Sequence, residues 1–144
     1  MVPRFGYEFL PHTTDAYIQA TGATFEEALE NAGRALFHTM CDVNSISLEF
    51  VEEVEVQGAD EVTLLYGWLE SLLLKFELEG KVYAGFEVVS VRRSDGFRAH
   101  SRISGEKYDK RKHGGKVEVK AVTYHRMEVI RNKAVVIVRF ILDL

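Results

Sequence analysis

The strongest constraint on the fold is a change of hydrophobic period at Lys81. Before this residue the chain contains two segments with helical spacing of apolar residues, and beyond it apolar and polar residues alternate with period two. The alternation predicts four strands, over residues 82–92, 97–108, 117–130 and 134–142. Turn-forming residues at 94–96 and 131–133 predict hairpins, so the neighbouring strands run antiparallel. Consecutive strands after helices are typical of the α+β class.

Two helices and three short strands precede this run. Thr24 and Glu27 have the form of a capping box, and helical periodicity continues from there to Cys41. Asp60 caps a second helix over 61–78, and we expect its Trp68 in the core, not as a stacking platform for a base. The other strands are expected at 5–10, 16–20 and 48–57. We therefore predict one α+β domain, 1–144, with two helices packed on one face of a mostly antiparallel sheet.

The composition is that of a globular protein with a core of its own. The 144 residues are 47% hydrophobic and 28% charged, which supports a core without disulfides or structural metal. The single cysteine, Cys41, excludes an internal disulfide and a thiolate metal cage, and we expect it to be a packed side chain. The first residues lack the apolar core of a signal peptide, and the run 135–142 is too short to span a bilayer. We expect a cytoplasmic protein without membrane association.

The net charge of −4 conceals an uneven distribution. Residues 1–80 carry 3 Lys/Arg against 15 Asp/Glu, whereas residues 81–144 carry 15 against 7, so the halves have charges of −12 and +8. Such a division is expected either for two faces of one domain that cancel through space or for a surface that meets a charged partner. The basic second half keeps nucleic acid among the candidate partners.

A polar stretch, 11–15, separates the first two predicted strands and ends in Asp15. Its simplest interpretation is a turn whose side chains cap their own backbone. The last predicted strand, however, runs directly into Asp143 and Leu144. If that strand lies beside the strand after Asp15, the side chains of Asp15 and Asp143 converge with the terminal carboxylate of Leu144. A cluster of three carboxylates must be hydrated, protonated or neutralised, and a hard cation held by oxygens is the natural counterion.

The most basic segment is 107–116, which could meet phosphates through Lys107, Lys110, Arg111, Lys112 and Lys116. The alternative is a mobile, solvated hairpin tip. Lys120, in the middle of a predicted strand, is either an exposed edge charge or, beside acidic groups, a functional one. On the alternation of 117–125, Val119 and Ala121 share one face of this strand, and Lys120 and Val122 share the other.

Taken together, these motifs resemble the archease family. The resemblance extends over nearly the whole chain, in order and at matching spacing, and rests on the motifs at 12–15, 22–28, 64–74, 105–106, 119–125 and 142–144. It implies a compact α+β fold of the SHS2 type. Pro11 departs from the pattern, because many relatives have an acidic residue there.

The resemblance implies an accessory protein of RNA ligation, not an independent enzyme. Archeases assist the RtcB-type ligase of tRNA splicing, which uses manganese and GTP and passes through a guanylylated histidine. They promote that guanylylation and allow multiple turnover. The family's metal site maps onto Asp15, Asp143 and Leu144, and its important strand lysine maps onto Lys120. Calcium is the cation that the resemblance implies, and magnesium and manganese remain open.

We therefore expect an activator of the RtcB-type ligase that works through a divalent cation held by carboxylates, with transient contact to tRNA halves. Lys120 would reach a shared phosphate or carboxylate, and His12 would assist at the metal or be hydrogen-bonded within its turn. Two alternatives belong to other classes. A metal-dependent phosphoesterase would use the same carboxylates, although the sequence offers no convincing nucleophile or base. An RNA-binding or chaperone-like module would use segment 107–116.

Overall fold

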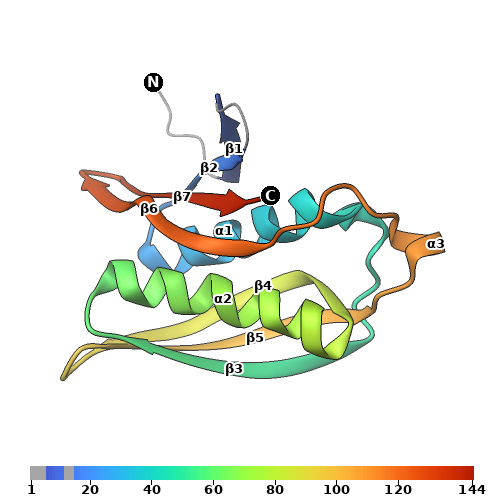
Figure 1. Ribbon diagram of the computed structural model, residues 1–144. Coiled ribbons are helices and arrows are strands. Elements are labelled where there is room, and N and C mark those ends of the chain that lie inside the picture. The colour runs from blue at the N-terminus through green and yellow to red at the C-terminus, as the bar shows by residue number, and fades with distance from the viewer. Residues whose placement is uncertain (1–5, 12–14) are drawn as a thin grey trace.

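Seven strands and three helices make up the part of the chain that the computed structural model describes, residues 6–11 and 15–144 (Figure 1). In order along the chain, they are β1 (Gly6–Leu10), β2 (Ala16–Gly22), α1 (Phe25–Met40), the 3-10 turn η1 (Val43–Ser45), β3 (Phe50–Gly58), α2 (Glu61–Glu79), β4 (Lys81–Arg93), β5 (Phe97–Lys107), α3 (Lys110–His113), β6 (Ala121–Asn132) and β7 (Val135–Asp143). The change of period predicted at Lys81 coincides with the first residue of β4.

The strands form two antiparallel sheets with the long helices between them (Figure 1). One sheet has the order β1-β2-β7-β6 and the other has the order β3-β5-β4. α1 packs against β2 and β4, and α2 packs against β3 and β6, so each helix contacts both sheets. The predicted α+β class and antiparallel pairing are confirmed. The strands differ from the prediction in forming two sheets around the helices instead of one sheet beneath them.

The helices begin where the sequence predicts. Thr24 caps α1, because its Oγ1 accepts a hydrogen bond from the Glu27 amide at 3.1 Å. Asp60 caps α2 by accepting from the Thr63 amide at 2.8 Å, and the Thr63 hydroxyl accepts from the Asp60 amide at 3.0 Å. Gly80 ends α2 in the left-handed region, with φ of 65°. Local capping thus fixes both helices before tertiary packing contributes.

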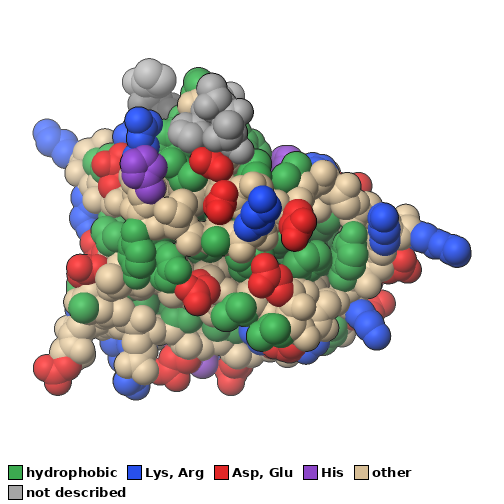
Figure 2. Space-filling model, viewed as in Figure 1, with side chains coloured by type: hydrophobic (Ala, Val, Ile, Leu, Met, Phe, Trp, Pro, Cys, Tyr) green, Lys and Arg blue, Asp and Glu red, His purple; other side chains and the backbone are tan. Residues whose placement is uncertain are grey.

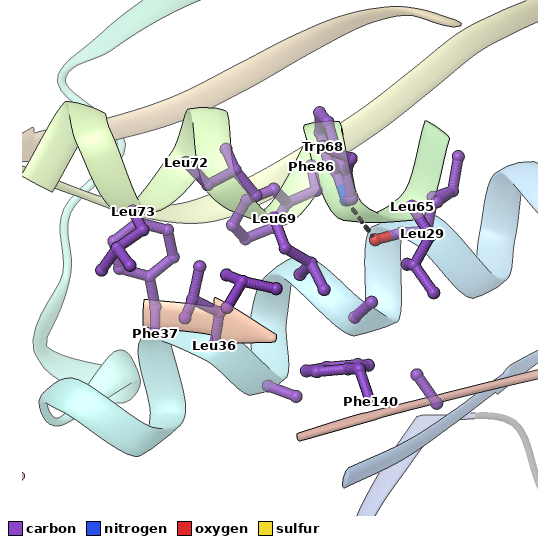
Figure 3. Close-up of a cluster of buried hydrophobic side chains, with 14 of the residues drawn as sticks. Leu29, Leu36, Phe37, Leu65, Trp68, Leu69, Leu72, Leu73, Phe86 and Phe140 are labelled. Atoms are coloured by element: carbon purple, nitrogen blue, oxygen red, sulfur yellow. Dashed lines mark hydrogen bonds between the residues drawn. The ribbon is translucent and has the colours of Figure 1, made fainter. Parts of the chain in front are cut away.

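The core fills the space between the two sheets (Figure 3). Trp68 is fully buried, and its indole Nε1 donates to the Leu29 carbonyl of α1 at 2.8 Å, which confirms the prediction that it is a core residue. Phe86 packs edge-on against the Trp68 ring, Phe37 stacks on Phe86, and leucines of α2 belong to the same cluster (Figure 3). Cys41 is buried as predicted, and burial raises the pKa of its thiol to about 11, which keeps it protonated and unreactive.

Both predicted hairpins are present, but β6, the first strand of the second hairpin, begins later than predicted. Asp95 and Gly96 have φ of 52° and 95° between β4 and β5, as a tight hairpin turn requires. The prediction that a strand begins at 117 is wrong, because β6 begins at Ala121. Val119 and Val122, predicted on opposite faces, are both buried, since 114–120 is not in strand conformation.

The acidic and basic halves of the chain cancel each other through space. Glutamates of β3 form ion pairs with β5, among them Glu55 with Arg98 at 3.4 Å and Glu53 with Arg102 at 3.8 Å. Acidic and basic side chains accordingly intermingle on the face shown in Figure 2. Of the two explanations for the uneven charge, these pairs support mutual neutralisation. No helix among the described residues is long and apolar enough to cross a membrane.

Candidate functional site

The pairing of β2 with β7 brings Asp15 and Asp143 to adjacent positions. The register ends with Ala16 opposite Leu142, Asp15 directly precedes Ala16, and Asp143 is the last residue of β7. Directly opposed residues of antiparallel strands have Cβ atoms about 5 Å apart. Ile18, Phe140 and Leu142 face the helices in the core, so alternation directs Asp143 to the opposite, outer face of the sheet. The sequence expectation that these two carboxylates meet is therefore supported by the register.

Lys120 lies at the same end of the sheet. Its amide donates a hydrogen bond to the Asp143 carbonyl at 2.7 Å, and the following residue, Ala121, is the register partner of Asp143. The Lys120 side chain is exposed. Three of the residues singled out in the sequence thus lie at the same end of this sheet, just before β2, at the end of β7 and just before β6. His12 lies outside the described residues.

A surface pocket of about 370 Å³ joins Asp15 to the end of the chain. Asp15 and Leu144 both line it, together with His38 from the last turn of α1 and Lys116 from the basic segment. Aromatic and aliphatic residues, including Phe9, form the rest of the wall. The pocket is therefore bounded by one carboxylate side chain, the terminal residue and two nitrogen-bearing side chains.

His38 is a pocket residue that sequence reasoning missed. Its Nδ1 is hydrogen-bonded to the Tyr7 hydroxyl at 2.7 Å, and its ring packs edge-on against Tyr7 and Phe9. Burial, together with the nearby charge of Lys116, lowers the pKa of His38 below its usual value, so the ring is neutral at pH 7. The sequence shows only a histidine in the last turn of a helix. Its position beside β1 depends on contacts 31 residues apart.

The donors at this end of the sheet fit a hard cation. Within residues 6–11 and 15–144, no three His, Cys, Asp or Glu side chains lie close enough together to hold a metal ion. Asp15 and Asp143 supply two carboxylates, and a third oxygen donor would have to come from the main-chain carboxylate of Leu144. An all-oxygen set of this kind suits calcium or magnesium, and also manganese.

The basic segment is more ordered than a solvated hairpin tip. It contains α3, and Lys112 donates to the Glu106 carboxylate at 2.9 Å and to the Ser47 hydroxyl at 2.9 Å. Lys112 is therefore engaged in the fold, and Lys116 lines the pocket of Asp15. The remaining members of the predicted phosphate-contact set, Lys107, Lys110 and Arg111, are exposed. Phosphate contact by these five residues stays a prediction, with Lys112 held by Glu106 and Lys116 at the pocket.

Glu106 anchors this segment through a buried network. His113 is 1% exposed, and its Nδ1 accepts from the Asp109 amide at 2.9 Å. Since that nitrogen accepts, Nε2 carries the proton and donates to Glu106 at 2.8 Å. Glu106 also accepts from the Ser47 amide at 2.7 Å. Hydrogen bonds from Lys112, His113 and Ser47 lower the pKa of Glu106 to about 2, so it is ionised at neutral pH.

We expect this network to make the protein acid-sensitive in a defined pH range. A carboxylate whose pKa falls from about 4.5 to about 2 on folding stabilises the fold above pH 4.5, and that contribution is lost as the pH falls toward 2. Glu106→Gln should therefore melt well below the wild type at pH 7, and the gap in Tm should narrow by pH 3. Thermal unfolding followed by circular dichroism from pH 7 to 3 measures this gap. A gap independent of pH would contradict the assignment.

Comparisons with known proteins show the family of this chain. Residues 7–144 match the family model described as the Archease protein family (MTH1598/TM1083). The chain is 42% identical to the protein archease of Pyrococcus abyssi over 123 residues, which cover 85% of this chain and 87% of that protein. It is 35% identical to the protein archease of Methanopyrus kandleri over 138 residues, covering 96% and 99%.

Solved structures share the fold. The solution structure of Methanobacterium thermoautotrophicum protein 1598 superposes with a TM-score of 0.81 at 34% identity, covering 96% of this chain and 99% of that one. The crystal structure of an archease from Thermotoga maritima gives a TM-score of 0.57 at 19% identity, a likeness of fold alone. Because the family model matches almost the whole described chain and the relatives exceed 30% identity over most of their length, this chain belongs to the archease family.

Proposed function

We propose that this chain is a cytoplasmic accessory protein that activates an RtcB-type tRNA-splicing RNA ligase, and that it is not an enzyme in its own right. It would promote guanylylation of the ligase and its repeated turnover. Membership of the archease family supports this role. The observation that supports the proposal most is the register of β2 and β7, in which Ala16, the residue after Asp15, pairs with Leu142, the residue before Asp143.

The carboxylates give the protein its part in the reaction. Asp15 and Asp143, with the main-chain carboxylate of Leu144, would hold a divalent cation through oxygen alone, with calcium as the first candidate and magnesium or manganese as alternatives. When bound, the cation supplies positive charge for phosphate oxygens. Because Asp15 directly precedes β2 and Asp143 ends β7, the pairing of these strands would limit the movement of both side chains and so reduce the conformational entropy lost on binding.

Lys120 provides a positive charge at the same edge. Its backbone is fixed by the bond to Asp143, while its exposed side chain is free to turn toward a carboxylate or a phosphate. With the ligase docked, Lys120 would bind a phosphate oxygen and so position the phosphate for attack at its phosphorus atom by the ligase's own histidine. This is assistance by positioning and electrostatics. His12, three residues before Asp15 in the sequence, would assist at the cation.

The test is multiple-turnover joining of an RNA that ends in a 2′,3′-cyclic phosphate to a 5′-hydroxyl RNA. A cognate RtcB-type ligase is assayed with GTP and manganese, with and without substoichiometric amounts of this protein. We expect product in large excess over ligase only when the protein is present. Absence of stimulation would overturn the proposal. Hydrolysis of phosphodiesters by the protein alone would instead support a phosphoesterase, and salt-sensitive RNA affinity without stimulation would support an RNA-binding module.

A further inference from the structure

An irregularity in β6 places an arginine on the outer face of the four-stranded sheet. Thr123 pairs with Ile141 and Glu128 pairs with Arg139, so residues 124–127 of β6 oppose the single residue Phe140 of β7. Three extra residues are therefore inserted into β6. A bulge of this kind bends the strand and redirects its side chains, and bulges are frequent beside functional sites.

Arg126, within this bulge, has a strained backbone. Its φ is 58°, and Asp95 in a hairpin turn is the other residue apart from glycine with positive φ among the described residues. An aspartate in a tight turn tolerates this conformation, whereas an arginine rarely adopts it and here does so only within the bulge of β6. Strain that the surrounding fold maintains is a signal of function at that position.

The guanidinium of Arg126 lies over the Tyr17 ring, with 5.8 Å from Cζ to the ring centroid. Tyr17 lies two residues after Asp15 on β2, and its register partner Ile141 lies two residues before Asp143 on β7. Two residues along a strand span about 7 Å. The Arg126 guanidinium is thus held over Tyr17, which lies two residues along the chain from Asp15 and opposite the residue that is two before Asp143. The contact with Tyr17 shows that the guanidinium is on the outer face, because the neighbouring Ile18 faces the core.

This arginine is also unneutralised. Within residues 6–11 and 15–144, the Arg126 side chain makes no ion pair or hydrogen bond, and its contact is with the Tyr17 ring. Arg139, on the same outer face, instead donates to Glu128 at 3.0 Å and to Gln19 at 2.8 Å. The five donors of the Arg126 guanidinium are therefore available to an anion from outside the protein.

We propose that Arg126 and the cation site of Asp15 and Asp143 together bind a phosphate monoester, an inference that rests on the cation site of the proposed function. One phosphate oxygen would contact the cation while a second accepts from the guanidinium, whose planar fork matches a phosphate. Without a cation, the two carboxylates would repel the phosphate. The ligand is either the terminal phosphate of an RNA or the phosphate of a guanosine nucleotide, which share this chemistry.

The experiment is calorimetric titration of the protein alone, first with Ca²⁺ and then with three probes. The probes are a short RNA ending in a 3′-phosphate, the same RNA ending in a 3′-hydroxyl, and GMP. With Ca²⁺ present, we expect the phosphate-ended RNA or GMP to bind about 10-fold more tightly than the hydroxyl-ended RNA. The probe whose affinity rises when Ca²⁺ is present identifies the source of the phosphate. If the phosphate-ended RNA or GMP bound as tightly in EDTA as with Ca²⁺, the bridging arrangement would be overturned.

The variants separate ligand binding from a merely structural role. Arg126→Met keeps the apolar cover over Tyr17 but should lose the 10-fold preference, whereas Arg126→Lys should keep part of it. Arg92→Met, which removes an exposed charge from the other sheet, should leave it unchanged. Arg126→Gly relieves the positive φ, and we expect a rise in Tm of about 2–4 °C together with loss of the preference. A purely structural arginine would give the reverse, a lower Tm and unchanged affinity.

The outcomes distinguish the two proposals from each other. If the wild type takes up no Ca²⁺, Mg²⁺ or Mn²⁺, the cation site fails and this inference fails with it. If the cation binds but Arg126→Met retains full preference for the phosphate, only the role of Arg126 is overturned. Full ligase stimulation by Arg126→Met would likewise leave the proposed function intact.

Discussion

Asp15→Ala is expected to reduce the stimulation of an RtcB-type ligase by about 100-fold or more. Loss of residues that merely orient a metal ligand already costs 10–100-fold in affinity, so loss of a direct oxygen donor should cost at least as much. Asp143→Asn should have a comparable effect, because it removes the second carboxylate of the proposed cation site at the same end of the β2-β7 pair. The measurement is the initial rate of multiple-turnover joining at a fixed, substoichiometric amount of each variant.

Two controls make this result interpretable. Glu49→Gln removes an exposed carboxylate just before β3, on the other sheet, and should stimulate as well as the wild type. Asp15 lies outside the regular strand, so its alanine variant should keep its Tm within about 3 °C. Manganese binding followed by paramagnetic relaxation of solvent water should weaken in parallel with stimulation. An Asp15→Ala variant that stimulates fully would refute the carboxylate mechanism.

Gly105→Ala is expected to cost about 3 kcal/mol or more of folding free energy. A Cβ at this position would lie 1.9 Å from the Val82 carbonyl oxygen and 2.8 Å from the Tyr83 Cα. Both obstacles are backbone atoms of β4, the strand paired with β5, and cannot rotate away as a side chain would. Relief therefore requires separation of the two strands, next to the Glu106 network. Urea unfolding at pH 7 would measure the loss.

Gly67→Ala is the matched control within the same protein. Gly67 lies in α2, and its added Cβ would come 3.6 Å from the Gln57 carbonyl oxygen, an ordinary contact. Alanine is favoured over glycine in a helix by about 0.5–1 kcal/mol, so this variant should be slightly more stable than the wild type. If Gly105→Ala proved as stable as the wild type, the close approach of β4 and β5 at this point would be disproved.

The sequence predicted the elements well because their causes are local. Capping at Thr24 and Asp60, the turn at Asp95 and the period-two alternation after Lys81 are decided by neighbouring residues. The failures also have a physical cause. The alternation of 117–120 continues that of β6, but the segment 116–120 is bonded to the rest of the fold through single backbone hydrogen bonds, from Lys116 to the Met40 carbonyl at 3.0 Å and from Lys120 to the Asp143 carbonyl at 2.7 Å. Periodicity does not report such long-range bonds.

The division of the strands into two sheets illustrates the same limit. Both helices have apolar residues that need cover, and the pattern shows which residues these are. It does not show that α1 meets β2 on one side and β4 on the other. Backbone hydrogen bonds join the strands, but they are nearly the same for every residue type and so do not specify which strands pair. Register, and therefore sheet membership, depends on the packing of the whole core.

By itself, the sequence determined the α+β class, the boundaries of α1 and α2 and the burial of Trp68, and it singled out Asp15 and Asp143 as candidate site residues. Only the tertiary structure decided that β2 pairs with β7 so that Ala16 opposes Leu142, that His38 lines the pocket of Asp15, and that Lys112 is hydrogen-bonded to Glu106. It also decided that the bulge of β6 carries Arg126 to the outer face. The reason is that periodicity and capping act over a few residues, whereas a site is assembled by register between strands more than 100 residues apart.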